Sequence, residues 1–139
     1  MSIFAINWLA VIVCVVFAMV NGSIWYNPKT FFKKWWEVVG NGKEPGMANM
    51  APVWILTIVA AAVKAIFIGV AVNVFAPRLG GISALTGLLT GAIVWVGVVA
   101  PTYLVNKLFA GHGFKVWAIE VGNHLLDMLA FGVLFGVWR

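Results

Sequence analysis

Four continuous apolar stretches, each long enough to cross a lipid bilayer, constrain this chain more than any other feature of its sequence. They cover about residues 3–26, 52–76, 82–105 and 115–138. A helix needs roughly 20 apolar residues to span the hydrocarbon core. The stretches also lack the alternation of polar and apolar residues that marks a membrane β-strand. The sequence therefore predicts an all-α, polytopic membrane protein, with four transmembrane helices in one domain over residues 1–139.

The composition supports the same class of protein. Charged residues make up only 9% of the 139 residues, whereas they make up about a quarter of an average soluble domain. Cys14 is the only cysteine, so an intrachain disulfide is excluded.

A short segment at about residues 28–40 has a different, amphipathic pattern. Pro28 suits the first turn of a helix and Gly40 suits its end. Large aromatic side chains gather on one side and basic side chains on the other, namely Phe31, Phe32, Trp35 and Trp36 against Lys29 and Lys33. We expect a short interfacial helix in the headgroup plane that anchors the chain to the membrane. The alternative is a specific site for a lipid or a partner.

Basic residues in the loops predict the orientation of the chain. The first and third loops hold Lys29, Lys33, Lys34, Lys43, Lys107 and Lys115, whereas the opposite side has only Arg78 and Arg139. Because loops rich in Lys and Arg stay in the cytoplasm, we expect these lysines to face the cytoplasm and both termini to lie outside.

Ionisable side chains interrupt two of the apolar stretches. Lys64 lies near the middle of the second, and Glu120, His124 and Asp127 lie in the last. At about 100° per residue, the last three fall within an arc of roughly 60° on one helix face. Charges at this depth are costly, so this face should contact protein or water instead of lipid. An ion pair between Lys64 and an acid, either Asp127 or Glu120, is the simplest way to keep both in the membrane.

Three interpretations of this intramembrane polar cluster, to which we add Asn7 of the first helix, remain open. It can fix helix pairing, form a pathway for protons or ions, or hold a small ligand or metal. One His and two acids spread over two turns do not match a known metal-ligand spacing, so we predict no metal and no cofactor. Phosphate-binding loops, nucleophile elbows and zinc-protease motifs are absent from the sequence, which predicts that the chain is not an enzyme.

Small residues form helix-packing stripes in the third and fourth stretches. Ser83, Gly87 and Gly91 recur at four-residue spacing, and Gly132 and Gly136 do the same near the C-terminus. Such stripes let two helices approach closely, either inside one bundle or between subunits.

Several motifs near the two ends are similar to those of a known family. They are Asn7-Trp8-Leu9-Ala10, then Gly22, Trp25-Tyr26 and Pro28, the pair Trp35-Trp36, and the closing stretch from Gly132 to Gly136-Val137-Trp138-Arg139. In this combination the chain resembles the small membrane proteins grouped as domain of unknown function 1761. The resemblance implies a bacterial integral membrane protein, in the inner membrane, and implies no particular activity.

Two functions are compatible with these features. The first is a structural or accessory subunit of a homo- or hetero-oligomeric membrane complex, whose partners are lipid, copies of itself or other membrane subunits. The second is a homo-oligomeric proton- or ion-linked transporter or channel that uses the Glu-His-Asp face. Neither function involves nucleic acid.

Overall fold

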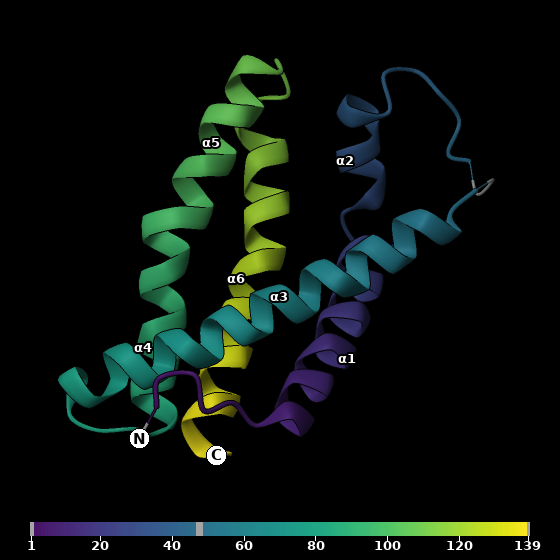
Figure 1. Ribbon diagram of the computed structural model, residues 1–139. Coiled ribbons are helices and arrows are strands. Elements are labelled where there is room, and N and C mark those ends of the chain that lie inside the picture. The colour runs from purple at the N-terminus through teal and green to yellow at the C-terminus, as the bar shows by residue number, and fades with distance from the viewer. Residues whose placement is uncertain (1, 47–48, 139) are drawn as a thin grey trace.

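The computed structural model describes residues 2–46 and 49–138. Within these two ranges, six α-helices follow one another: α1 (Trp8–Trp25), α2 (Phe32–Val39), α3 (Ala51–Phe75), α4 (Ala84–Val94), α5 (Ala100–Phe109) and α6 (Gly113–Val137) (Figure 1). A short 3₁₀ turn, η1 (Ala76–Leu79), extends α3, and a π-helical turn, η2 (Trp95–Val99), joins α4 to α5. The all-α fold class is confirmed.

Four of these helical segments are long and apolar enough to cross a membrane. They are Trp8–Trp25, Ala51–Leu79, Ala84–Phe109 and Gly113–Val137. Their number agrees with the sequence prediction, and together they indicate an integral membrane protein. Arg139, which we counted among the bases on the side of the termini, lies outside the described residues.

The ends of the helices differ from the predicted ranges for local reasons. The first span begins at Trp8 and not at residue 3, because Asn7 Oδ1 accepts the N–H groups of Leu9 and Ala10 and so caps α1. The amphipathic helix begins at Phe32 and not at residue 28. Before it, the chain turns, and the Thr30 hydroxyl donates to backbone carbonyls at the end of α1.

The third span continues to Phe109, beyond the predicted residue 105, through a local change of helix type. Pro101 has no N–H to donate, and just before it the Ala100 N–H donates to Trp95 O, five residues back. The chain therefore passes through one π-helical turn and continues as α5 without ending.

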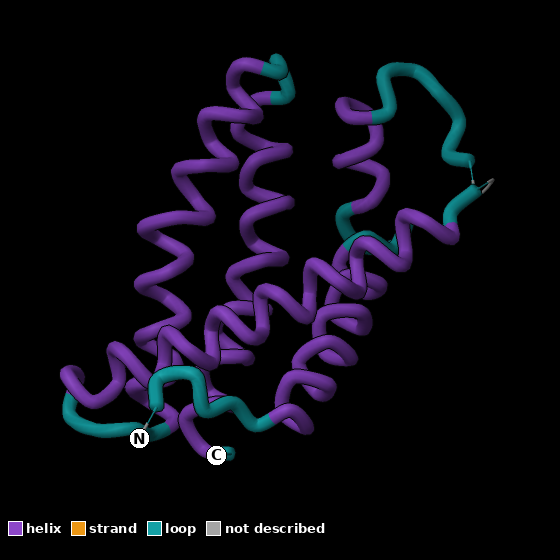
Figure 2. The backbone as a smooth tube through the Cα atoms, in the orientation of Figure 1, coloured by secondary structure: helices purple, strands orange, loops and turns teal. Residues whose placement is uncertain are grey.

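The helices form two groups that meet at α6. The continuous segment α4–η2–α5 runs antiparallel beside α6, and α3 crosses them obliquely (Figure 1). Both termini lie at one end of the molecule, while the loops that follow α2 and α5 lie at the opposite end (Figure 2). This arrangement places both lysine-rich loops at the same end of the molecule.

Glycines set the close packing of α4 on α6. Gly87 lies against the backbone of Gly132, Gly91 against Met128, and Gly136 against Ser83, so that a Cβ atom at any of these glycines would overlap a carbonyl oxygen. The small-residue stripes therefore face each other inside one chain, where they allow the backbones of α4 and α6 to come into contact.

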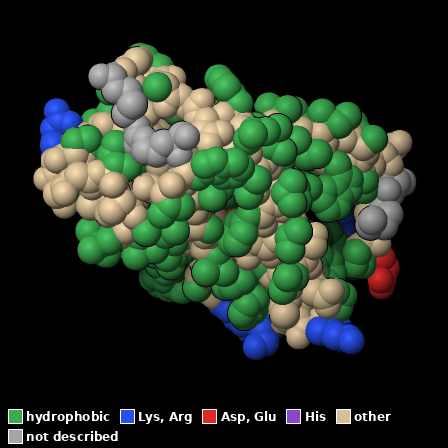
Figure 3. Space-filling model, turned by 90° about the horizontal axis from the view of Figure 1, so that it is seen from below, with side chains coloured by type: hydrophobic (Ala, Val, Ile, Leu, Met, Phe, Trp, Pro, Cys, Tyr) green, Lys and Arg blue, Asp and Glu red, His purple; other side chains and the backbone are tan. Residues whose placement is uncertain are grey.

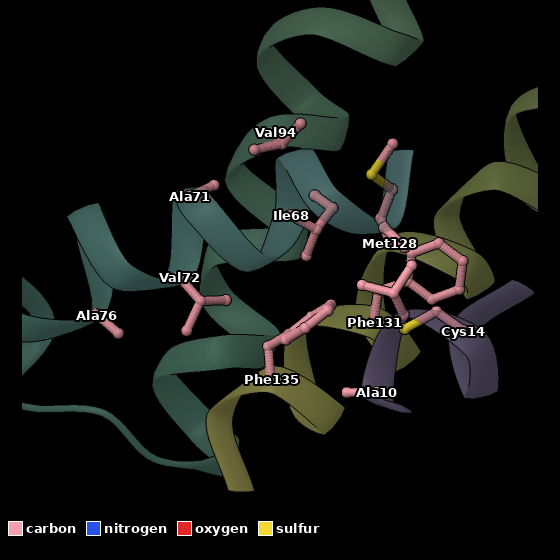
Figure 4. Packing of buried hydrophobic residues seen from close by; sticks show 12 residues of the cluster. Ala10, Cys14, Ile68, Ala71, Val72, Ala76, Val94, Met128, Phe131 and Phe135 are labelled. Carbon is pink, nitrogen blue, oxygen red and sulfur yellow. The ribbon is translucent and has the colours of Figure 1, made fainter. Parts of the chain in front are cut away.

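The apolar core lies where α1, α3 and α6 meet. Cys14 of α1, Ile68 and Val72 of α3, and Phe131 and Phe135 of α6 are buried in it (Figure 4). Many large apolar side chains are also exposed on the long helices, among them Ile12, Phe67 and Val96. Figure 3 looks from below Figure 1 onto the end where both termini lie, and hydrophobic side chains extend over much of that face too, with basic groups at its margins. An apolar exterior is what lipid tails require of a membrane-spanning protein.

Candidate functional site

An ion pair between α3 and α6 is the centre of the polar cluster. Lys64 Nζ lies 2.5 Å from Asp127 Oδ2, and the Asp127 side chain is only 3% exposed. The second carboxylate oxygen, Oδ1, accepts a hydrogen bond of 3.0 Å from Asn21 Nδ2 of α1. Both oxygens therefore have a donor, which is the condition under which a buried carboxylate is tolerated. The Phe131 ring, whose centroid is 5.5 Å from Lys64 Nζ, adds a cation–π contact.

His124 connects this pair to α5. Its Nδ1 lies 3.3 Å from Lys64 Nζ, and its Nε2 lies 2.9 Å from the Tyr103 hydroxyl. A lysine ammonium can only donate, so Nδ1 must accept. A neutral imidazole then carries its proton on Nε2 and donates it to the Tyr103 oxygen, and this bonding pattern assigns the tautomer. The Tyr103 O–H has no acceptor among the residues that the structure describes, so it can donate to a further group.

Glu120 belongs to a separate polar contact nearer the lysine-rich loops. Trp35 Nε1 of α2 donates to its Oε1 at 3.0 Å, and Lys107 Nζ of α5 lies 3.0 Å from its Oε2. Glu120 shares a helix face with His124 and Asp127, but the helical rise places it roughly 10 Å from Asp127 along the axis. Lys64 therefore pairs with Asp127 and not with Glu120.

The structure brings together most, but not all, of the residues singled out in the sequence. Lys64, His124 and Asp127 form one network, whereas Asn7 lies outside it and caps α1. The network also contains Asn21 and Tyr103, which the predicted cluster did not include. The signal available for Asn21 was its position, since it follows Cys14 by seven residues on one face of the first helix.

The aromatic residues in and just before α2 are half-buried, and the lysines of the same segment are exposed. Phe31, Phe32, Trp35 and Trp36 make up the first group, and Lys29 and Lys33 the second. Trp35 reaches α6 through Glu120, and Trp36 Nε1 donates to the carbonyl of Lys43 in the following loop. The aromatic side of α2 is therefore tied to protein at two points.

Two pockets adjoin the network at different residues. The larger, of about 420 Å³, lies between α1, α3 and α6, and Lys64, His124 and Asp127 form part of its wall. The smaller, of about 190 Å³, is lined by Thr102, Tyr103, Asn106 and Lys107. The side chains of Lys64, His124 and Tyr103 thus form a hydrogen-bonded connection from one pocket to the other.

The site has the chemistry of a proton carrier or of a binding site for a small molecule. Within residues 2–46 and 49–138, no three His, Cys, Asp or Glu side chains are placed to hold a metal ion. The groups that remain are a lysine, a histidine and a tyrosine in series, all able to exchange protons.

Comparison with known proteins agrees with the resemblance seen in the sequence. A search of curated proteins and a search of solved structures each return no match. A family model described as "protein of unknown function (DUF1761)" matches residues 9–136, which is nearly the whole chain. The match includes all four candidate membrane spans except Trp8, the first residue of the first span, and Val137, the last residue of the last span. The chain therefore belongs to the DUF1761 family of proteins of unknown function.

Proposed function

We propose that this protein moves protons, alone or together with a solute, through the polar network of its membrane domain. One observation carries the proposal: Lys64, His124 and Tyr103 form an unbroken chain of hydrogen bonds between two pockets. Ionisable residues inside a membrane are expensive, and they commonly mark the path of a proton or an ion. The proposed role is that of a small transporter or channel and is not enzymatic.

The proposed path transfers one proton in three coupled movements. Lys64 gives a proton to His124 Nδ1, while the proton on His124 Nε2 passes to the Tyr103 oxygen, and the original Tyr103 hydroxyl proton leaves toward the smaller pocket. Lys64 is then neutral and takes up a proton from the larger pocket, which restores its charge. His124 returns to its first tautomer before the next cycle.

Asp127 and Asn21 hold the starting point of this path in place. The Asp127 carboxylate keeps the Lys64 ammonium beside His124, and Asn21 donates to the carboxylate oxygen that Lys64 does not use. The path lies inside one chain. It therefore does not depend on a homo-oligomer, although it is compatible with one.

The test is proton flux into liposomes that contain the purified protein. A potassium gradient with valinomycin supplies the driving force, and an enclosed pH-sensitive dye reports the flux. We expect flux above that of protein-free liposomes in the wild type. We expect at least a tenfold loss in Tyr103→Phe, which keeps the ring but removes the final hydroxyl. His124→Ala should abolish the flux, because it breaks the path in the middle.

His112→Ala is the matched control, because His112 is the only other histidine and lies in the turn before α6. Circular dichroism would establish that each variant keeps its helix content. Wild-type liposomes without flux would overturn the proposal. Flux that is equal in the His124→Ala and His112→Ala proteins would also overturn it, because the protons would then take another path.

The second candidate is an accessory subunit of a larger membrane complex. Its support is the first part of α3, where residues 51–60 are all exposed and mostly apolar, so that another helix could pack on them. The small-residue stripes no longer support it, because α4 and α6 use them within the chain. Extraction from the native membrane in mild detergent decides between the two: stoichiometric recovery with other subunits would favour the accessory role.

A further inference from the structure

We propose that the larger pocket binds a small membrane-soluble molecule with an apolar body and an uncharged polar head that both donates and accepts a hydrogen bond. A phenol or a long-chain alcohol has this chemistry. The pocket volume of about 420 Å³ falls within the usual range for small-molecule sites. This inference deepens the proposed function, since the molecule would be the solute that moves with the proton.

The wall of the pocket is the reason why we expect the ligand to have an apolar body. The part of the lining that α1 and α3 contribute is mainly apolar side chains and glycine, including Ala18, Met19, Gly22, Trp54 and Ala61. Trp54 is 44% exposed and lies in the apolar first part of α3 that faces away from the core. A ligand would therefore enter from the bilayer, between α1 and α3.

The polar end of the pocket is the reason why we expect the ligand to carry a head group that both donates and accepts a hydrogen bond. Lys64 lines the pocket, and hydrogen bonds to Asp127 and His124 use two of its three N–H groups, which leaves one donor. Asn123 also lines the pocket, and its Oδ1 is buried with no hydrogen-bond partner among the described residues. A buried acceptor without a partner is costly. A ligand hydroxyl would accept from Lys64 and, with a turn of the Asn123 side chain toward the pocket, donate to its Oδ1.

The charges at this end favour an uncharged head. Lys64 and Asp127 carry opposite charges 2.5 Å apart, so the pair is neutral as a whole. An anionic head would lie close to the Asp127 carboxylate, and a cationic head close to the Lys64 ammonium. Neither would find excess charge of the opposite sign to offset the loss of its hydration.

The test is calorimetric titration of the protein in lipid nanodiscs with three probes of similar size. These are 4-hexylphenol, hexylbenzene, which lacks the polar head, and 4-hexylbenzoate, whose head is an anion. Titration of empty nanodiscs removes the contribution of partition into lipid. We expect 4-hexylphenol to bind at least tenfold more tightly than either other probe, and Asn123→Leu to remove most of this advantage.

A pair of glycine variants links the binding to the pocket. Gly22 lines the pocket and a Cβ there has open space around it, so Gly22→Leu should fill the pocket without disturbing the helices. Gly97 has equally open space but lies outside the pocket, in η2, and Gly97→Leu is the matched control. We expect Gly22→Leu to lose 4-hexylphenol binding and Gly97→Leu to keep it.

Three outcomes would overturn the inference: hexylbenzene binding as tightly as the phenol, the benzoate binding more tightly, or Gly22→Leu binding as well as Gly97→Leu. Binding is measured here without a proton gradient. A protein that binds the phenol but conducts no protons would therefore refute only the proposed function, and a protein that conducts but does not bind would refute only this inference.

Discussion

At the scale of single residues, the ion pair between the part-buried Lys64 and the buried Asp127 is the contact on which we expect stability to depend most. Asp127 is 2% exposed, and each of its carboxylate oxygens accepts from a different helix, from Lys64 of α3 and from Asn21 of α1. The positive charge of Lys64 and the negative charge of Asp127 cancel only while both residues are present. Loss of one partner leaves the other as an uncompensated buried charge, and this is far more costly than loss of both.

We therefore expect Asp127→Asn to destabilise the protein by about 3–5 kcal/mol. The double change Lys64→Met with Asp127→Leu should recover much of that loss, because no buried charge remains. Thermal unfolding in detergent, followed by circular dichroism, measures both. Glu37→Gln, which changes an exposed acid on α2, is the control and should have little effect. An Asp127→Asn protein as stable as the wild type would show that the pair contributes nothing.

The sequence predicted the charged members of this site better than the uncharged ones. Lys64, His124 and Asp127 stand out because ionisable groups are rare in apolar helices. Asn21 and Tyr103 carry no such signal, because asparagine and tyrosine near the end of a span are common and have many ordinary roles. Which amide joins the network depends on how α1 crosses α6, and the periodicity of one helix does not contain that information.

At the scale of helices, α6 is the element against which the others are placed. It meets α4 through glycines, α5 through His124 and Tyr103, and α2 through Glu120 and Trp35. Of these three contacts, the glycine contact between α4 and α6 leaves the least space for a larger side chain. A methyl group at Gly87 would overlap the carbonyl oxygen of Gly132, so the two backbones would have to separate.

We expect Gly87→Ala to destabilise the protein by about 1–3 kcal/mol, the usual cost of overpacking. Gly97→Ala makes the same chemical change where a Cβ meets open space, and it should be neutral or slightly stabilising. The same unfolding assay compares the two variants. Equal stability of the two would mean that α4 and α6 are not as close at this point as the contact requires.

The attachment of α2 to α6 includes a hydrogen bond from Trp35 to the charged acceptor Glu120. Trp35→Phe keeps an aromatic ring but removes the N–H that donates to Glu120. Since such a bond contributes about 1.5–3 kcal/mol, we expect the backbone amides of α2 to exchange with solvent at least tenfold faster. Hydrogen exchange with mass spectrometry measures this change. Trp36→Phe, which removes only the bond to the Lys43 carbonyl, should leave the link to α6 intact; a similar effect of both changes would contradict the role of Glu120.

At the scale of the whole molecule, the sequence predicted how many spans there are but not how they meet. Hydropathy and length determine the number of spans, because both depend on each stretch alone. The oblique crossing of α3 and the π-helical turn at η2 depend on packing between stretches (Figure 1). For the same reason, the glycine stripes predicted a close helix contact without identifying the partner, and the structure identifies it as a contact between α4 and α6.

The even number of spans places both termini at one end, and the lysine-rich loops lie at the other (Figure 2). If positive charge retains those loops in the cytoplasm, an introduced cysteine should report the side of the membrane. We expect Glu44→Cys, in the loop after α2, to resist a membrane-impermeant maleimide in intact cells and to react after lysis. Leu79→Cys, at the end of η1, should react in intact cells. The wild type is the control, since Cys14 is buried and should stay unlabelled. The reverse labelling would mean that the lysine-rich loops lie outside the cytoplasm.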